Sequence, residues 1–146
     1  MNCIFCNIVQ GEFESSKDYE DDRILAFMDI QPVREGQVLV IPKEHIDHFS
    51  DIPDELAAKI FLIAHHISQA VKKSLHPERV GLIVHGYGVP HAHMIVCAQH
   101  DKDDITSGLM AAVENGKVVF LAENVPVVSR SELNRVTGVI REYVSL

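Results

Sequence analysis

The chain has 146 residues, of which 47% are hydrophobic and 23% charged, with a formal net charge of −8. These values are typical of one globular domain with its own core, and no apolar run reaches the ~18 residues of a membrane span. The negative charge argues against a broad basic surface for nucleic acid but allows a small phosphorylated ligand, which needs only local donors. The N-terminus has no signal-peptide pattern, so we expect a cytoplasmic protein.

The first part of the chain predicts a short helix followed by two strands. Residues 3–9 are apolar and precede Gly11, a pattern typical of a short helix or turn closed by glycine. Residues 23–29 and 37–41 are predicted to be strands, because they are apolar and a loop with proline and glycine separates them.

The clearest predicted element is a helix over residues 54–75. Its apolar side chains recur every three or four residues, which is the spacing of one helical face. Pro53 suits a first helical turn, and Pro77 follows the predicted end.

The next elements predict a β-hairpin and one further strand. Residues 80–85 and 89–97 are apolar strand candidates, and only the short link 86–88 separates them. Residues 117–122 form another candidate strand.

A final helix is predicted to begin near Ser129, because Ser129 and Glu132 have the spacing of a capping box. The order of strands and helices lacks regular βαβ alternation. We therefore expect a single α+β domain over residues 1–146, with a mainly antiparallel sheet, one long helix and a C-terminal helix.

Two histidines are spaced to share one face of a strand. Alternate side chains of an extended chain point the same way, so we expect His91, His93 and Ile95 on one face. A lone histidine in a strand is usually structural. For two histidines on one face, a metal or catalytic role and a structural role are about equally supported by the spacing. Neutral imidazole binds metal ions and attacks electrophiles near pH 7.

Cys3 and Cys6 form a CxxC pair near the start of the sequence. A redox-active pair is expected between a strand and a helix of a βαβ unit, and no strand is predicted before this one. We therefore favour zinc, which takes four ligands in a structural site. Histidines must supply the other two: His45, or its rival His48, and His91.

Asp29 ends a predicted strand at the start of a loop. Such a carboxylate is commonly a solvated turn residue. The functional alternative is a carboxylate that accepts hydrogen bonds from two vicinal ribose hydroxyls, as in other nucleotide sites.

Three segments together resemble a known family. In order and spacing, CIFCNIVQGE, LAFMDIQPVREGQVLVIPKEH and VPHAHMIV are similar to the histidine triad (HIT) superfamily of nucleotide hydrolases and transferases. The resemblance covers roughly residues 1–97. It implies a HIT-like α+β domain, found as a homodimer, that acts on the α-phosphate of purine nucleotide derivatives.

The resemblance also implies roles for individual residues. His93, as the middle histidine, would attack the phosphorus and form a nucleotidyl-histidine intermediate that water releases. Bacterial members with an N-terminal CxxC resemble this chain, and their structural zinc ligands fall on Cys3, Cys6, His45 and His91. The family's nucleoside pocket falls on Ile4, Phe5, Ile8, Phe27, Asp29 and Ile30, with Asp29 facing the ribose hydroxyls.

The chain departs from the family pattern where phosphate is bound. The third triad histidine is replaced by Ile95, which has no hydrogen-bond donor, and the loss of one donor at a charged transition state typically costs about 10²–10³ in rate. The link before the motif is short, and the Pro-Arg pair often found after it is absent. His85 is a candidate to substitute for the missing histidine.

Three functions therefore remain open from the sequence. The first is a zinc-stabilised nucleotide hydrolase or nucleotidyl transferase with a degenerate triad. The second is a nucleotide-binding protein of the same fold with little turnover, and the third is a zinc-structured interaction protein with no nucleotide site. None of them involves nucleic acid or a membrane.

Overall fold

The computed structural model describes residues 3–104, 111–120 and 125–145. Its elements in chain order are α1 (Ile4–Gln10), β1 (Lys17–Glu20), β2 (Ile24–Met28), β3 (Val38–Pro42), a 3₁₀ turn (Phe49–Asp51), α2 (Asp54–Leu75), β4 (Arg79–Ile83), β5 (Met94–Gln99), β6 (Ala111–Glu114), β7 (Lys117–Phe120) and α3 (Arg130–Arg141). Among these residues, no helix is both long enough and apolar enough to cross a membrane.

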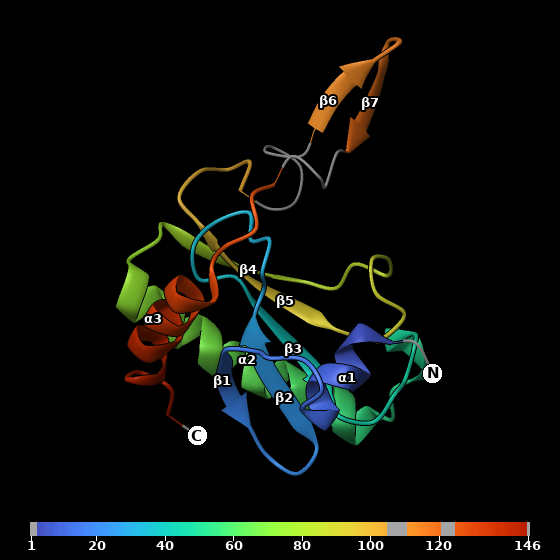
Figure 1. Cartoon of the computed structure of the whole chain (residues 1–146), viewed down its shortest axis with the longest axis vertical. Helices are drawn as coiled ribbons and strands as arrows, with labels where there is room; N and C mark the ends of the chain where they lie inside the picture. The colour runs from blue at the N-terminus through green and yellow to red at the C-terminus, as the bar shows by residue number, and fades with distance from the viewer. Residues whose placement is uncertain (1–2, 105–110, 121–124, 146) are drawn as a thin grey trace.

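The centre of the molecule is a five-stranded sheet with the order β1-β2-β3-β5-β4. Each neighbouring pair in it is antiparallel. The strands β6 and β7 form a separate antiparallel hairpin that projects from the body (Figure 1). The predicted α+β class with a mainly antiparallel sheet is confirmed.

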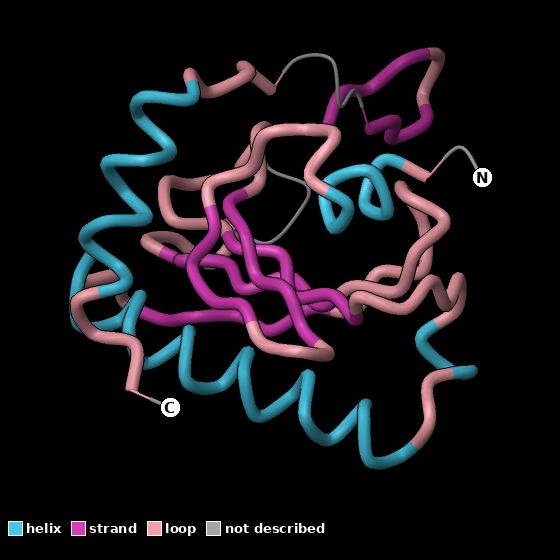
Figure 2. The backbone as a smooth tube through the Cα atoms, turned by 60° about the horizontal axis from the view of Figure 1, so that its bottom comes forward, coloured by secondary structure: helices cyan, strands magenta, loops and turns pink. Residues whose placement is uncertain are grey.

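Helices cover both faces of the sheet, with α2 along one face and α1 on the other (Figure 2). Alternate residues of β2 divide between the two cores, because successive strand side chains point to opposite faces. Ile24 and Ala26 pack in the core that contains α2 and α3, whereas Leu25 and Phe27 pack in the smaller core that contains Phe5 of α1. The α1 face therefore has a small apolar core beside the histidine segment.

The long helix occupies the predicted range, Asp54–Leu75. Acidic residues in its first turn and lysines in its last turn complement the helix dipole. His76 ends the helix in the left-handed conformation, with φ 52°, just before Pro77. The buried stripe of this helix consists of Leu56, Ile60, Ile63, Ala64, Ile67, Ala70 and Val71.

The two shorter helices also follow their sequence signals. α1 ends at Gly11, whose φ of 79° is readily adopted by glycine. α3 begins after Ser129, whose Oγ accepts a hydrogen bond from the backbone N–H of Glu132. The capping signal therefore located the start of α3 correctly.

The predicted hairpin between residues 80–85 and 89–97 is wrong in its extent. β5 begins only at Met94, and the connection from β4 spans residues 84–93. Pro90 has no N–H to donate, and the N–H of Ala92 donates to the carbonyl of Ile46 at 2.7 Å. The backbone N–H between the two histidines therefore bonds to the segment after β3 and not to β4.

Two strands had no clear sequence signal. β1 is short and polar at three of its four positions, and β6 pairs with β7 to form the projecting hairpin. The predicted strand 117–122 corresponds to β7 as far as Phe120, and its last two residues lie outside the described ranges.

Candidate functional site

Three separate segments bring two cysteines and two histidines together. Cys3 precedes α1 and Cys6 lies one turn later, so both thiols are on the same side of the helix. His45 follows β3, and His91 precedes β5. One ligand atom from each of the four residues lies within 4.8 Å of every other. His48, the rival of His45, is exposed and lies outside this group.

The spacing of these atoms fits a tetrahedral metal ion. Ideal tetrahedral zinc, with Zn–S near 2.3 Å and Zn–N near 2.0–2.1 Å, places sulfur and nitrogen ligands roughly 3.5 Å apart. The Nδ1 of His91 lies 3.5 Å from the Sγ of Cys3 and 3.6 Å from the Sγ of Cys6. The Nδ1 of His45 lies 3.2 Å from the Sγ of Cys6. The four residues could therefore hold zinc.

The hydrogen bond of the second ring nitrogen determines the tautomer of His91. Its Nε2 lies 2.8 Å from the carbonyl oxygen of Pro42, which can only accept, so Nε2 carries the proton and Nδ1 presents a lone pair to the thiols. Burial, opposed by this hydrogen bond, lowers the pKa of His91. Burial and the neighbouring Cys3 raise the pKa of the Cys6 thiol. A bound metal cation would favour the thiolates that these residues need as ligands.

His93 is oriented by the same segment. Its Nδ1 lies 2.7 Å from the carbonyl oxygen of His91 and donates a hydrogen bond to it, so in the neutral ring the lone pair is on Nε2. The ring meets the edge of Phe5 at a centroid distance of 5.5 Å, and the residue is 9% exposed. The hydrogen bond and the contact with Phe5 therefore fix the orientation of the ring.

A cavity of about 350 Å³ lies beside His93 on the α1 face of the sheet. Its volume is within the usual range for a small-molecule site. All six residues predicted for the nucleoside pocket line it: Ile4, Phe5, Ile8, Phe27, Asp29 and Ile30. Their role in binding stays a prediction, but the structure brings all of them and His93 into one wall.

Asp29 contributes one carboxylate to this cavity. The backbone N–H of Gln31 donates to its Oδ1 at 2.9 Å, and the side-chain amide of Gln37 donates to its Oδ2 at 2.7 Å. Each oxygen can still accept further hydrogen bonds. The orientation of the Asp29 carboxylate is therefore fixed, and its oxygens keep acceptor positions for a ligand.

Ile95 lies in the wall of the same cavity as His93. It is paired in the sheet with Leu39 and Ile83, and its half-buried side chain packs against the smaller core. The position of the third histidine is therefore aliphatic.

His85 lies on another side of His93. A second cavity of only about 30 Å³ is lined by both of these histidines together with Asp47 and His48. His85 is exposed, and its ring lies 6.1 Å from the ring of Tyr87. His85 is not among the residues that line the larger cavity.

Two residues of this cavity, Val125 and Arg130, were not predicted from the sequence. The backbone oxygen of Val125 accepts from Gln31 Nε2 at 2.9 Å, and Arg130 donates to the carbonyl of Glu14 at 3.0 Å. Both Val125 and Arg130 line the cavity, although they are far along the chain from its other residues. No motif marks them, because only the packing of Val125 and of the start of α3 brings them there.

Comparison with known proteins identifies the family. The model of the HIT domain matches residues 10–102, and the chain belongs to this family. Protein hit of Bacillus subtilis is 38% identical over 108 residues, which are 70% of this chain and 74% of that protein. The adenosine 5'-monophosphoramidase HNT1 of Saccharomyces cerevisiae is 37% identical over 102 residues, which are 68% of this chain and 64% of that protein.

Solved structures show the same fold. A Hit-like protein of Bartonella henselae aligns with a TM-score of 0.80 at 24% identity, covering 97% of this chain and 96% of that one. A Zn-bound histidine triad family protein of Mycobacterium smegmatis aligns with a TM-score of 0.75 at 25% identity, covering 99% of this chain and 94% of that one.

Proposed function

We propose that this HIT-family protein is a nucleotide hydrolase or nucleotidyl transferase that acts on the α-phosphate of a purine nucleotide derivative. The observation that carries the proposal is the placement of His93. Its Nδ1 is bound to the carbonyl of His91, which leaves Nε2 as the free nucleophile, and its ring lines a cavity that also contains Asp29. The yeast relative is by name an adenosine 5'-monophosphoramidase, which supports a phosphoramidate as substrate.

The reaction would proceed in two displacements. Nε2 of His93 forms a bond to the α-phosphorus while the bond to the leaving amine or alcohol breaks, and the leaving group takes the electron pair and a proton from water. Water, or an acceptor alcohol in a transferase, then attacks the phosphorus, and the bond between phosphorus and Nε2 breaks and returns its electron pair to Nε2. The proton of the attacking O–H goes to the hydroxide that the first step leaves, so the two steps balance. Covalent catalysis of this kind divides one difficult step into two easier ones.

The nucleoside would lie in the apolar part of the cavity. Phe5 and Phe27 meet edge to face there, with centroids 5.4 Å apart, and offer an apolar surface to a purine base. Asp29 would accept hydrogen bonds from the two ribose hydroxyls. Its two oxygens retain free lone pairs for this purpose.

We propose that zinc, bound by Cys3, Cys6, His45 and His91, has a structural role. It would supply a cross-link between α1, the end of β3 and the segment before β5. Because the backbone carbonyl of His91 holds His93, fixing His91 also fixes the nucleophile. The Zn-bound neighbour of this fold supports the choice of metal.

Ile95 favours a second candidate function, a nucleotide-binding protein with weak turnover. An aliphatic side chain in the cavity wall cannot donate to a phosphoryl oxygen. We propose the enzyme as the principal function, because Ile95 leaves the nucleophile and the carboxylate in place. A zinc-structured interaction protein without a nucleotide site is the remaining alternative.

The test is hydrolysis of adenosine 5'-phosphoramidate by the zinc-loaded protein. We expect the wild type to release AMP at least about 100-fold faster than His93→Ala, because the variant lacks the nucleophile. His100→Ala, at an exposed histidine outside the cavity, is the control and should keep the wild-type rate. Equal rates for wild type and His93→Ala, with tight AMP binding by both, would favour the binding protein; absence of binding would favour the interaction protein.

We further propose that residues 1–146 form one domain and that two copies form a homodimer in the cytoplasm. In the described part of the chain, β4 has a strand partner on one side only. Phe61 and Leu62, adjacent on the neighbouring helix α2, are 54% and 52% exposed and offer apolar surface beside this edge. Sedimentation of wild type and Leu62→Glu tests this, with a monomeric variant and a dimeric wild type expected.

A further inference from the structure

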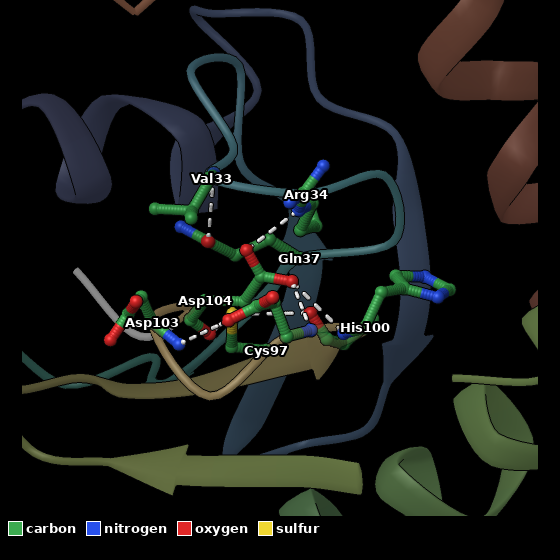
Figure 3. A network of polar contacts seen from close by, with 9 residues as sticks. Val33, Arg34, Gln37, Cys97, His100, Asp103 and Asp104 are labelled. Carbon is green, nitrogen blue, oxygen red and sulfur yellow. Dashed lines mark hydrogen bonds and ion pairs between the residues drawn. The ribbon is translucent and has the colours of Figure 1, made fainter. Parts of the chain in front are cut away.

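Gln37 is buried beneath the loop that carries Asp29, and its side chain bridges two groups of that loop. The amide Nε2 donates to Oδ2 of Asp29 at 2.7 Å, and the amide oxygen accepts from the backbone N–H of Val33 at 3.1 Å (Figure 3 shows the second bond). Gln37 is only 5% exposed and is not among the residues that line the cavity. It therefore reaches a ligand only through Asp29.

We propose that Gln37 is a positioning residue that sets the orientation of the Asp29 carboxylate for the two vicinal hydroxyls of a ribose. This proposal rests on the proposed function, because it takes the cavity as a nucleoside site. Gln37 makes no contact with the ligand, and its effect is confined to how Asp29 is presented.

The hydrogen bonds of Asp29 explain how the orientation is set. One N–H donor binds each carboxylate oxygen, the backbone of Gln31 on Oδ1 and the amide of Gln37 on Oδ2. A carboxylate oxygen accepts about two hydrogen bonds, so one position remains on each for one hydroxyl. Without the second donor, the carboxylate could rotate about its single bond to Cβ and present these positions less often.

The loop has a second anchor that is independent of Gln37. Arg34 Nε donates to Oδ1 of the buried Asp104 at 2.8 Å, and the backbone N–H groups of His100 and Asp101 donate to the other oxygen at 2.9 and 2.8 Å (Figure 3). Burial opposes ionisation of Asp104, but these hydrogen bonds outweigh it and lower its pKa. Arg34 anchors the same loop through Asp104 and has no hydrogen bond to Asp29. Substitution of Arg34 is therefore a matched control for a general loosening of the loop.

The sharpest variant is Gln37→Glu. It keeps the size of the side chain and an oxygen acceptor for the N–H of Val33, but it replaces the donor to Asp29 with an ionisable oxygen. A protonated glutamate at this position could donate to Asp29 as glutamine does, whereas two ionised carboxylates in contact repel each other. The variant is therefore expected to acquire a pH dependence of ribose recognition that the wild type lacks.

The experiment measures the affinities of AMP and 2',3'-dideoxy-AMP by calorimetry for wild type, Gln37→Glu, Gln37→Leu and Arg34→Gln. We expect the wild type to bind AMP about 10- to 100-fold more tightly than the dideoxy analogue. Gln37→Leu should lose most of this preference while its dideoxy-AMP affinity stays within about 3-fold of the wild type. Gln37→Glu should show the preference near pH 5 and lose it by about pH 8. Arg34→Gln should keep it.

Three results would overturn the proposal, and they differ in whether the proposed function also fails. A wild-type preference that survives in Gln37→Leu, and in Gln37→Glu at pH 8, would show that Gln37 does not position Asp29, although the proposed function would stand. Equal loss in Arg34→Gln would show that Gln37 only braces the loop. A wild type that binds both analogues equally would remove the ribose-binding role of Asp29 and the positioning role of Gln37 together. If Gln37→Leu does not fold, the isosteric Gln37→Glu decides alone.

Discussion

His93 uses its two ring nitrogens for different tasks. Nδ1 is bound to the carbonyl of His91, whereas Nε2 is the nitrogen that we propose as the nucleophile; the aliphatic Ile95 lines the same cavity. A transferring phosphoryl group carries negative charge on its non-bridging oxygens and is stabilised by donors aimed at them. At the scale of single residues, Ile95 is therefore the feature that most limits the proposed activity.

Restoring an imidazole at this position should raise the activity. We expect Ile95→His to increase kcat for adenosine 5'-phosphoramidate by about 10- to 100-fold, because a donor returns to the wall beside His93. Ile95→Val is the control, since it keeps an aliphatic side chain and should leave kcat near the wild-type value. A kcat for Ile95→His no higher than that of Ile95→Val would mean that the substrate's phosphate does not lie near residue 95.

Asp18 predicts a pH-dependent stability that is unrelated to the cavity. Burial raises the pKa of its carboxyl to about 7, and the nearby Thr137 hydroxyl and Arg141 offset burial only in part. The folded state therefore favours the protonated form. The corresponding stability is fully present below the unfolded pKa near 3.8 and is lost as the pH rises through 7, by at most about 4 kcal/mol.

The variant Asp18→Asn removes this titration. Its melting temperature should exceed that of the wild type at pH 8, and the difference should shrink steadily as the pH falls toward 3.8, because the wild-type carboxyl is then protonated in the folded state and increasingly protonated in the unfolded state. Thermal melts at several pH values measure this. A constant difference from pH 4 to pH 8 would show that Asp18 has an ordinary pKa in the folded protein.

At the scale of elements, the predictions succeeded where the signal is local. The bounds of α2 follow from its apolar period and its flanking prolines, and the start of α3 follows from Ser129. Residues 84–85 and 89–93 were predicted to be strand but lie in the link between β4 and β5, where the N–H of Ala92 bonds to Ile46, a residue far away in the sequence. A local sequence pattern cannot predict a hydrogen bond between two residues that are so far apart in the sequence.

The same distinction applies to the candidate site. The CxxC pair and the paired histidines are visible as spacings, and Asp29 is visible at the end of an apolar run. Gln37 reads as an ordinary polar residue at the start of the predicted strand 37–41, because only the fold brings its amide to Asp29. Arg130 reads as part of a helix start until the packing of α3 puts it at the cavity.

The cap of α3 should contribute measurably to stability. Ser129→Ala removes the acceptor for the N–H of Glu132 and should lower the free energy of unfolding by about 1 kcal/mol. Ser131→Ala, which removes a hydroxyl in the first turn but no backbone cap, should cost less. Chemical denaturation of both variants tests this, and an equal loss in the two would contradict the capping role.

In the molecule as a whole, the four residues Cys3, Cys6, His45 and His91 bring together three segments that are far apart in the sequence. Cys3 and Cys6 belong to the start of α1, whereas His45 and His91 belong to the connections after β3 and before β5. A tetrahedral ion here would cross-link the α1 face of the sheet beside the cavity. Metal binding of this kind adds to folding stability.

Loss of one ligand should therefore lower both the zinc content and the stability. We expect the purified wild type to carry about one zinc per chain, measured by mass spectrometry of the metal, and Cys3→Ser to carry much less and to melt at a lower temperature. Cys97→Ser should keep its zinc, because this buried cysteine lies outside the cluster. A Cys3→Ser protein with a full equivalent of zinc would show that the ligands are assigned wrongly.

We propose that His93 faces the α-phosphorus of a nucleotide in the cavity on the α1 face. A crystal structure of the zinc-loaded protein with AMP tests this most directly. We predict the base between α1 and Phe27, the ribose hydroxyls on Asp29, and the phosphorus roughly 3–3.5 Å from Nε2 of His93. An AMP molecule bound with its phosphate outside this cavity, or a cavity that stays empty at saturating AMP, would contradict the account.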